Sequence, residues 1–173
     1  SDICLGHLEF QGFEMYRGAV IDHGLSHKAF QKFDMVCSGH FHHKSTKDNI
    51  NYLGAPYEMT WSDYDDPRGF HVLDTETKEL QYFQNPFIMF HKVFYDDNQG
   101  EDILKQDFAK LKDTHVKVVV KNKDNPYLFD LYIDKLNAAN PAHMQVVEDN
   151  FNLDLEDDEN IVDEAEDTIT IIR

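Results

Sequence analysis

The sequence has no long apolar run, few cysteines and few basic residues. None of its 173 residues fall in a stretch of about 18 consecutive apolar residues, so the sequence predicts no membrane span. It opens on Ser1-Asp2 with no basic leader region, and we therefore expect no signal peptide. Together these features predict a cytoplasmic protein.

The two cysteines, Cys4 and Cys37, each lie in an apolar, strand-like run. They do not form a Cys-x-x-Cys pair, the spacing typical of metal-binding and redox motifs. We therefore predict two reduced thiols in the core, rather than a disulfide or thiolate metal ligands.

Acidic residues outnumber basic ones: the chain has 33 aspartates and glutamates but only 16 lysines and arginines, which gives a net charge of −17. Such a balance is unusual for a protein that binds DNA. Residues 148–167 hold eleven of the acids and no base, and without them 22 acids face 16 bases, a net charge of −6. The body of the protein is therefore only mildly acidic, and we expect residues 151–173 to be a disordered acidic linker.

A pair of histidines follows a short apolar run. Met35-Val36-Cys37 predicts a buried strand that ends at the small residues Ser38-Gly39, and His40 and His42 come directly afterwards. If the chain is still extended there, both imidazoles point to the same side, where they can bind a transition metal. The alternative for an isolated His-x-His is a polar strand end with solvated histidines.

A third histidine stands in a similar context, and this favours the metal site. Ile3-Cys4-Leu5 is apolar, and Gly6-His7 follows it. We therefore predict that His7, His40 and His42 are metal ligands. His23 follows another apolar run, residues 19–21, and we expect it to make a polar contact near the site rather than to coordinate metal.

The motifs resemble those of a known family. Gly39-His40-Phe41-His42 resembles the Gly-His-x-His signature that closes the two-metal site of calcineurin-like metallophosphoesterases, and Gly6-His7 resembles the ligand motif before it. The stretch from Asn51 to Trp61 and Arg68-Gly69-Phe70 resemble the region after that signature in SbcD-type DNA repair nucleases. The residues from Gly54 to Trp61 most resemble the phage members of this group. The resemblance is good over residues 1–95 and weaker over 96–150.

The resemblance implies a subunit of a manganese-dependent DNA endonuclease or exonuclease that acts in phage recombination, repair and replication. It implies a two-metal Mn²⁺ site, with Mg²⁺ as the alternative, in which His7 and His40 share one ion and His42 binds the other. The implied partners are double-stranded DNA ends, an SMC-like ATPase and a second copy of the protein. If a phage encodes the chain, the implied location is the cytoplasm of the bacterial host.

The family pattern also includes an Asp-x-His motif, a bridging Asp and a Gly-Asn-His-Asp motif ahead of the position of His7. None of these stands between Ser1 and His7. We therefore expect the chain to hold only the second half of the catalytic domain, without the catalytic histidine, and to be inactive alone. The alternative is a non-catalytic fragment that serves as a protein-interaction or DNA-mimic module.

The expected fold class is α/β (α+β). For residues 1–86 the resemblance implies the second half of a metallophosphoesterase β-sandwich flanked by helices. The residues themselves predict a short helix from His27 to about Lys32, a solvated acidic turn over 62–68 and a β-hairpin over 69–83. Asn85-Pro86 marks the expected domain boundary.

Residues 87–150 predict a small α+β cap domain. Its expected elements are an extended aromatic segment, a helix over 103–112, a strand over 115–121, a helix that begins at Asn125-Pro126, and a strand over 144–147. That order fits the cap that follows the catalytic domain in SbcD-type nucleases.

Overall fold

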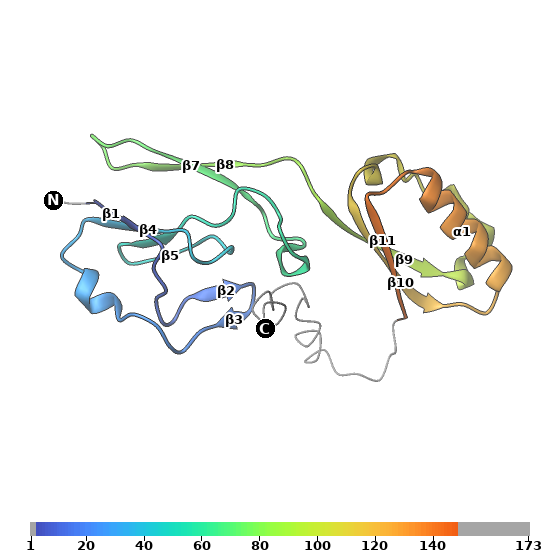
Figure 1. The fold of residues 1–173 in the computed structure, drawn as a ribbon, viewed down its shortest axis with the longest axis horizontal. Coiled ribbons are helices and arrows are strands. Elements are labelled where there is room, and N and C mark those ends of the chain that lie inside the picture. Colours follow the sequence, from blue (N-terminus) through green and yellow to red (C-terminus); the bar gives the residue numbers. More distant parts are fainter. Residues whose placement is uncertain (1–2, 149–173) are drawn as a thin grey trace, which may run out of the picture. The chain divides into compact units, whose positions relative to one another are not determined.

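The computed structural model describes residues 3–148, and the predicted acidic linker lies outside them. The described chain combines several small sheets with few helices, which confirms the mixed α/β class. It divides into two compact units, one ending at Ile88 and the other beginning at Met89 (Figure 1). No helix of this part of the chain is long and apolar enough to cross a membrane.

A four-stranded sheet organises the first unit. Its order is β1 (Ile3–Gly6), β4 (Met35–Ser38), β6 (Ile50–Tyr52) and β5 (Ser45–Lys47). The first three strands are parallel, and β5 runs antiparallel to β6. In the register of β1 and β4, Gly6 lies opposite Ser38. The two predicted strands are thus neighbours, and both end at the edge of the sheet from which the histidine loops leave.

The sheet packs on an aromatic core. Its buried side chains are Phe10, Phe13, Val36, Phe41, Ile50 and Tyr52. The rings of Phe41 and Tyr52 stack with centroids 4.4 Å apart. Cys37 is buried and Cys4 is half-buried, and both are free thiols.

Hairpins and single helical turns complete the first unit. They are β2 (Glu14–Tyr16) with β3 (Ala19–Val20), β7 (Gly69–Leu73) with β8 (Leu80–Gln84), and the 3-10 turns η1 (His27–Phe30) and η2 (Trp61–Asp63). The predicted hairpin over 69–83 is confirmed. The predicted helix after Ser26 is only one 3-10 turn, which buries no residue and has no side-chain cap. So short a segment gains too little from hydrogen bonding and burial to continue as an α-helix.

Three parallel strands form the sheet of the second unit, with β10 (His115–Asn122) between β9 (Phe90–Asp96) and β11 (His143–Glu148). The helix α1 (Pro126–Ala138) lies along one face of this sheet (Figure 1). Alternate residues of β10 point under it, and Val116, Val118 and Val120 are buried. The predicted strands over 115–121 and 144–147 are therefore confirmed.

The two helices predicted for this unit have different outcomes. Asn125 caps α1 by accepting a hydrogen bond from the N–H of Leu128 at 3.2 Å, with Pro126 at the first helical position, as predicted. The helix predicted over 103–112 is wrong, because the chain forms the 3-10 segments η3 (Asp97–Lys105) and η4 (Ala109–Leu111) instead. Gly100, at φ 59°, interrupts the first of these segments.

The core of the second unit predicts a sharp response to charge at Val118, which is fully buried. Val118→Asp places a carboxylate among apolar side chains, and should lower the free energy of unfolding by more than about 4 kcal/mol. The amide spectrum of residues 89–148 should then lose its dispersion. Val146→Asp, at a site 45% exposed on β11, should keep a native spectrum, and an equal effect of the two changes would contradict the assigned core.

Candidate metal centre

Two buried hydroxyls fix the segment that carries His7. Ser38, at the end of β4, accepts a hydrogen bond from the N–H of Leu8 at 2.9 Å and donates one to the carbonyl of Leu8 at 2.7 Å. Tyr52 donates to the same carbonyl at 2.9 Å and accepts from the N–H of Phe10 at 2.7 Å. Burial raises the pKa of Tyr52 to about 12, so its hydroxyl stays a donor at neutral pH. The loop after β1 is therefore held against β4 and β6.

His7 and His40 meet at this edge of the sheet. Nδ1 of His40 lies 3.0 Å from Nε2 of His7, and the two rings are nearly perpendicular at 87°. Nε2 of His40 lies 3.1 Å from Oε2 of Glu9, and the other oxygen of Glu9 lies 3.4 Å from Nε2 of His23. One carboxylate thus joins a predicted ligand to His23, which makes the polar contact that we expected of it.

His42 contacts a different carboxylate, at 3.1 Å between its Nδ1 and Oδ1 of Asp63. Asp63 is fully buried, and it accepts hydrogen bonds from the N–H groups of Met59 at 2.7 Å and Thr60 at 3.1 Å. Burial alone would raise the pKa of Asp63, but these hydrogen bonds, that of His42 and the charge of Arg68 outweigh it and lower the pKa. Asp63 is therefore an ionised acceptor that orients the ring of His42.

Arg68 neutralises the buried acids around the histidine motif. It is 3% exposed, and its guanidinium lies 2.8 Å from Asp63 and 3.0 Å from Asp66. It also donates to the carbonyl oxygen of His42. Asp66 in turn lies 2.8 Å from Nδ1 of His43. The prediction of a solvated turn over 62–68 is therefore wrong, because Arg68 and the histidines give two of its acids buried partners.

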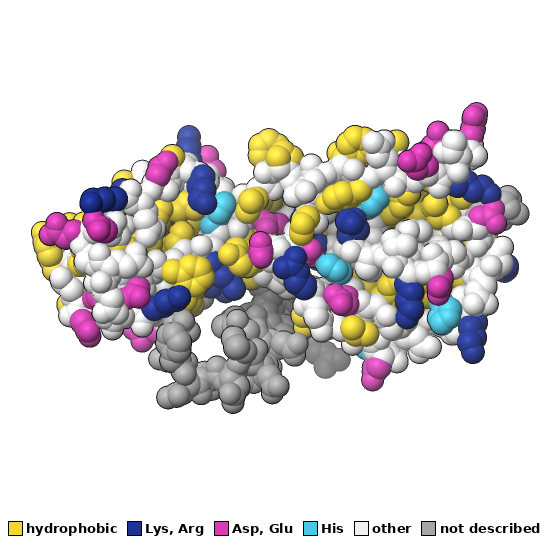
Figure 2. All heavy atoms as spheres, turned by 180° about the vertical axis from the view of Figure 1, so that it is seen from behind, with side chains coloured by type: hydrophobic (Ala, Val, Ile, Leu, Met, Phe, Trp, Pro, Cys, Tyr) yellow, Lys and Arg dark blue, Asp and Glu magenta, His cyan; other side chains and the backbone are white. Residues whose placement is uncertain are grey.

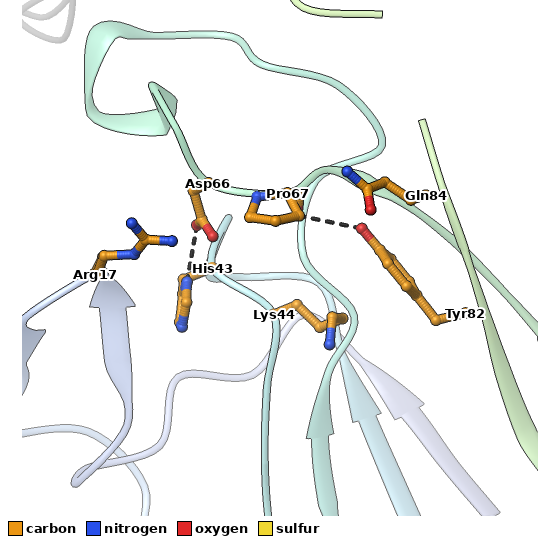
Figure 3. A pocket seen from close by; sticks show the side chains of 7 residues that line it. All are labelled: Arg17, His43, Lys44, Asp66, Pro67, Tyr82 and Gln84. Atoms are coloured by element: carbon orange, nitrogen blue, oxygen red, sulfur yellow. Dashed lines mark hydrogen bonds and ion pairs between the residues drawn. The ribbon is translucent and has the colours of Figure 1, made fainter. Parts of the chain in front are cut away.

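A pocket of about 390 Å³ adjoins His43 (Figure 3). Arg17, His43 and Asp66 lie on one side of it and Tyr82 and Gln84 on the other, and the complete lining is Arg17, His43, Lys44, Asp66, Pro67, Tyr82 and Gln84. The ammonium of Lys44 lies 4.8 Å from the centroid of the Tyr82 ring. The lining of the pocket therefore includes two cationic side chains, Arg17 and Lys44, and the aromatic ring of Tyr82.

The three predicted ligands are not gathered around one point. Among residues 3–148, no group of three or more His, Cys, Asp or Glu side chains is arranged to hold a metal ion. The structure brings His7 and His40 together and holds His42 on Asp63. The 3.0 Å between the nitrogens of His7 and His40 is a hydrogen-bond distance. It is also close to the separation of about 3.0–3.4 Å between two nitrogens that bind one metal with bonds of about 2.1 Å. This pair therefore fits part of a transition-metal site.

One Asp-x-His triplet does occur in the chain, at Asp113-Thr114-His115, but it is not part of this cluster. It lies at the start of β10 in the second unit, where the ring of His115 stacks on Phe90 with centroids 5.1 Å apart. It has the residue types and spacing of the family motif, but it is not positioned beside the Gly-His-x-His motif in the first unit.

Sequence reasoning missed Glu9, Asp63, Asp66 and Arg68. Asp63 had one local signal, because Thr60 and Asp63 have the spacing of a capping box, which the structure contains. Glu9 is separated from His40 by 31 residues, and the contact depends on the pairing of β1 with β4. Nothing in the local pattern could have revealed it.

Comparison with known proteins shows similarity to nucleases, although no protein-family model matches the chain. Exonuclease subunit 1 of Enterobacteria phage T4 is 34% identical over 137 residues, which are 79% of this chain and 39% of that protein. The D subunit of the SbcCD nuclease of Staphylococcus epidermidis is 26% identical over 75% of this chain and 34% of that protein. The corresponding protein of Staphylococcus saprophyticus is 24% identical over 98% and 49%.

The chain is therefore a homologue of nuclease subunits of the SbcD type. This confirms the resemblance that the histidine motifs and the segment from Gly54 to Trp61 predicted. It also agrees with the phage-like wording of that segment, since one of the relatives is the phage T4 exonuclease subunit. The chain spans between about a third and a half of the length of these relatives.

The buried charges predict that Arg68 is essential to the first unit. Arg68→Met leaves Asp63 and Asp66 without their cation, and should lower the free energy of unfolding by about 3–5 kcal/mol. Arg17→Met removes an exposed pair with Asp65, 3.7 Å apart, and should change it by no more than about 1 kcal/mol. Urea denaturation of both variants measures the difference, and equal midpoints would contradict the role given to Arg68.

Proposed function

We propose that this chain is part of a metal-dependent DNA nuclease subunit, which hydrolyses phosphodiester bonds in recombination, repair and replication. The observation that carries the proposal is the His7–His40 pair, whose ring nitrogens lie 3.0 Å apart in a homologue of nuclease subunits. His7 and His40 would hold one Mn²⁺ and His42 a second, with Mg²⁺ as the alternative ion. The remaining ligands would come from the part of the relatives that this chain does not cover.

The arrangement of the first unit supports its assignment as the second half of a metallophosphoesterase domain. Parallel strands β1 and β4 end at the same edge. β1 ends in Gly6 and is followed by His7, and β4 ends in Ser38 and is followed by Gly39 and His40. Convergence of side chains at such an edge is common in sites built on parallel sheets. The second unit, with its three-stranded sheet and one long helix, would be the cap domain.

Bound metal ions would polarise the scissile phosphate, supply a hydroxide nucleophile and stabilise the leaving oxygen. The residues of this chain would prepare that chemistry. Ser38 and Tyr52 hold the His7 loop in place, and Asp63 fixes the orientation of His42. Without the rest of the ligand set, we expect the chain alone to bind at most one weakly held metal ion and to be inactive.

Contact with DNA would be local rather than spread over a broad basic surface. On the face drawn in Figure 2, lysine and arginine side chains are interspersed with acidic and apolar ones. The pocket beside His43 offers Arg17 and Lys44 as phosphate-binding cations and Tyr82 as a stacking surface, a combination that suits nucleic acid. We therefore place part of the DNA path at this pocket.

The names of two relatives support a partner protein, and the family resemblance implies the other partners. These two relatives are D subunits of SbcCD nucleases, which are named as one component of a two-component complex. We propose that the parent protein acts on double-stranded DNA ends with an SMC-like ATPase, and as a homodimer.

The metal proposal predicts that His42 is essential for catalysis. In a protein that carries this chain and the missing part of the site, His42→Ala should lower turnover on linear duplex DNA with Mn²⁺ by at least about 100-fold. The variant should still fold, since the side chain of His42 is 34% exposed and Asp63 keeps Arg68 and the N–H groups of Met59 and Thr60 as partners. The matched control is His71→Ala, a half-buried histidine on β7 outside the motif, which should keep activity within a few-fold. Normal cleavage by the His42→Ala variant would contradict the proposal.

The pocket predicts a loss of DNA affinity when its cations are removed. The Arg17→Ala/Lys44→Ala double variant should weaken binding of a short duplex. The slope of log Kd against the logarithm of the salt concentration should fall by the amount expected for the loss of about two phosphate contacts. The charge-matched control is Lys28→Ala/Lys47→Ala, at exposed sites of the same unit. Fluorescence anisotropy with EDTA present compares the two, and equal affinities would exclude the pocket from the DNA path.

A further inference from the structure

The hairpin of β7 and β8 holds the ring of Tyr82 in place on the wall of the pocket beside His43. The hydroxyl of Tyr82 donates a hydrogen bond to the carbonyl of Pro67 at 3.2 Å. The centroid of its ring lies 5.0 Å from that of the His71 ring on the paired strand. Gly69 leaves room for the ring, because a Cβ there would lie 2.9 Å from two of its atoms. The position of the ring is therefore set by the folded hairpin before any ligand binds.

The side-chain amide of Gln84 lies beside this ring. Gln84 is two residues beyond Tyr82 on β8, so the two side chains lie on the same face of the hairpin (Figure 3). Within residues 3–148 the amide makes no hydrogen bond of its own. An amide offers both donors and an acceptor, and the edges of nucleobases present both kinds of group. The wall formed by Tyr82 and Gln84 therefore suits the face and the edge of a nucleobase.

Lys44 brings a positive charge to the same wall. Its ammonium lies 4.8 Å from the centroid of the Tyr82 ring. It forms no ion pair with a carboxylate in the described part of the chain, although the whole sequence has a net charge of −17. Attraction between an exposed cation and an aromatic face is weak, so Lys44 can leave the ring for a phosphate.

The opposite side of the pocket can also accept a negative charge. Arg17 lies there, across from Tyr82 (Figure 3). It pairs only loosely with Asp65, at 3.7 Å between two exposed side chains, and such a pair contributes little stability. A phosphate can therefore replace Asp65. The acid of the lining, Asp66, lies 3.0 Å from the buried guanidinium of Arg68, which compensates its charge.

We propose that this pocket binds one unpaired nucleotide of a DNA strand. The base stacks on Tyr82, and its edge meets the amide of Gln84. Lys44 and Arg17 bind the phosphates on either side of it. The volume of about 390 Å³ lies within the range of pockets for small molecules and cofactors, and so suits one nucleotide. This inference rests on the proposed function, because it starts from a DNA path that includes the pocket.

Base pairing excludes this mode of binding. In a duplex both faces of a base are stacked and its pairing edge is occupied, so protein side chains reach neither. Taking a base out of the stack costs least where the strand is already unpaired. The pocket therefore selects a single strand, or the frayed end of a duplex, over fully paired DNA.

Three probes separate this mode from contact with the DNA backbone alone. They are a single strand of thymidines, the same strand with abasic sites in place of the thymidines, and a blunt duplex, each about 12 nucleotides or base pairs long. Fluorescence anisotropy of the 173-residue chain with EDTA present gives Kd for each probe at one salt concentration. The thymidine strand should bind about fivefold or more tightly than the abasic strand, because only the former can stack on the ring.

Variants of β8 assign that preference to the ring. Tyr82→Leu should abolish the preference for thymidines over abasic sites, and should leave the affinities for the abasic strand and the duplex within about twofold. Unchanged affinity for the abasic strand also shows that this variant is folded. Tyr82→Phe keeps the ring and should keep the preference. The matched control is Phe83→Leu, which removes a ring 40% exposed on the opposite face of the hairpin and should also keep it.

Equal affinities of the unchanged chain for the thymidine and abasic strands would overturn the inference, and would assign the pocket to phosphates only. A preference for thymidines that survives Tyr82→Leu would overturn it as well. Both results leave the proposed DNA path intact if the Arg17→Ala/Lys44→Ala variant binds DNA more weakly. If that variant binds all three probes as the unchanged chain does, the DNA path through the pocket is contradicted together with this inference.

Discussion

The hydrogen bonds between Ser38 and the backbone of Leu8 are the contact on which the candidate site depends. They lie at the end of the parallel pairing of β1 with β4, where Gly6 is opposite Ser38. Parallel strands bring their carboxyl ends to one edge, and the buried hydroxyl fixes how the chain leaves that edge. As a result His7 and His40, which are 33 residues apart in the sequence, have ring nitrogens 3.0 Å apart.

The second constraint is the burial of charge beside these histidines. Two carboxylates, Asp63 and Asp66, are removed from water and share one guanidinium, that of Arg68. A buried carboxylate is stable only with such partners, and it then offers a fixed acceptor to a neighbouring ring. His42 and His43 each use one of these acceptors. The same network that makes this loop sensitive to mutation therefore keeps the rings of the motif in defined orientations.

The sequence predicted the elements that depend on local pattern. The apolar runs before Gly6 and Ser38, the hairpin over 69–83, and the helix that begins at Asn125-Pro126 all follow from periodicity and capping. The helix over 103–112 was wrong because the backbone leaves the helical region at Gln106, with ψ 139°, where the carbonyl accepts from Lys135 at 2.7 Å instead of from a helical N–H. The apolar spacing does not reveal this contact. The roles of Glu9 and Asp63 could not be predicted, because they depend on contacts 31 and 21 residues away in the sequence.

Paramagnetic relaxation by Mn²⁺ is the most direct test of whether the histidines after β1 and β4 bind metal. Mn²⁺ added to the ¹⁵N-histidine-labelled chain at substoichiometric amounts broadens only the signals of side chains near the bound ion. The ring signals of His7 and His40 should disappear first, while that of His71, in the same unit but outside the motif, persists. Uniform broadening, or earlier loss at histidines outside the motif, would contradict metal binding at this site.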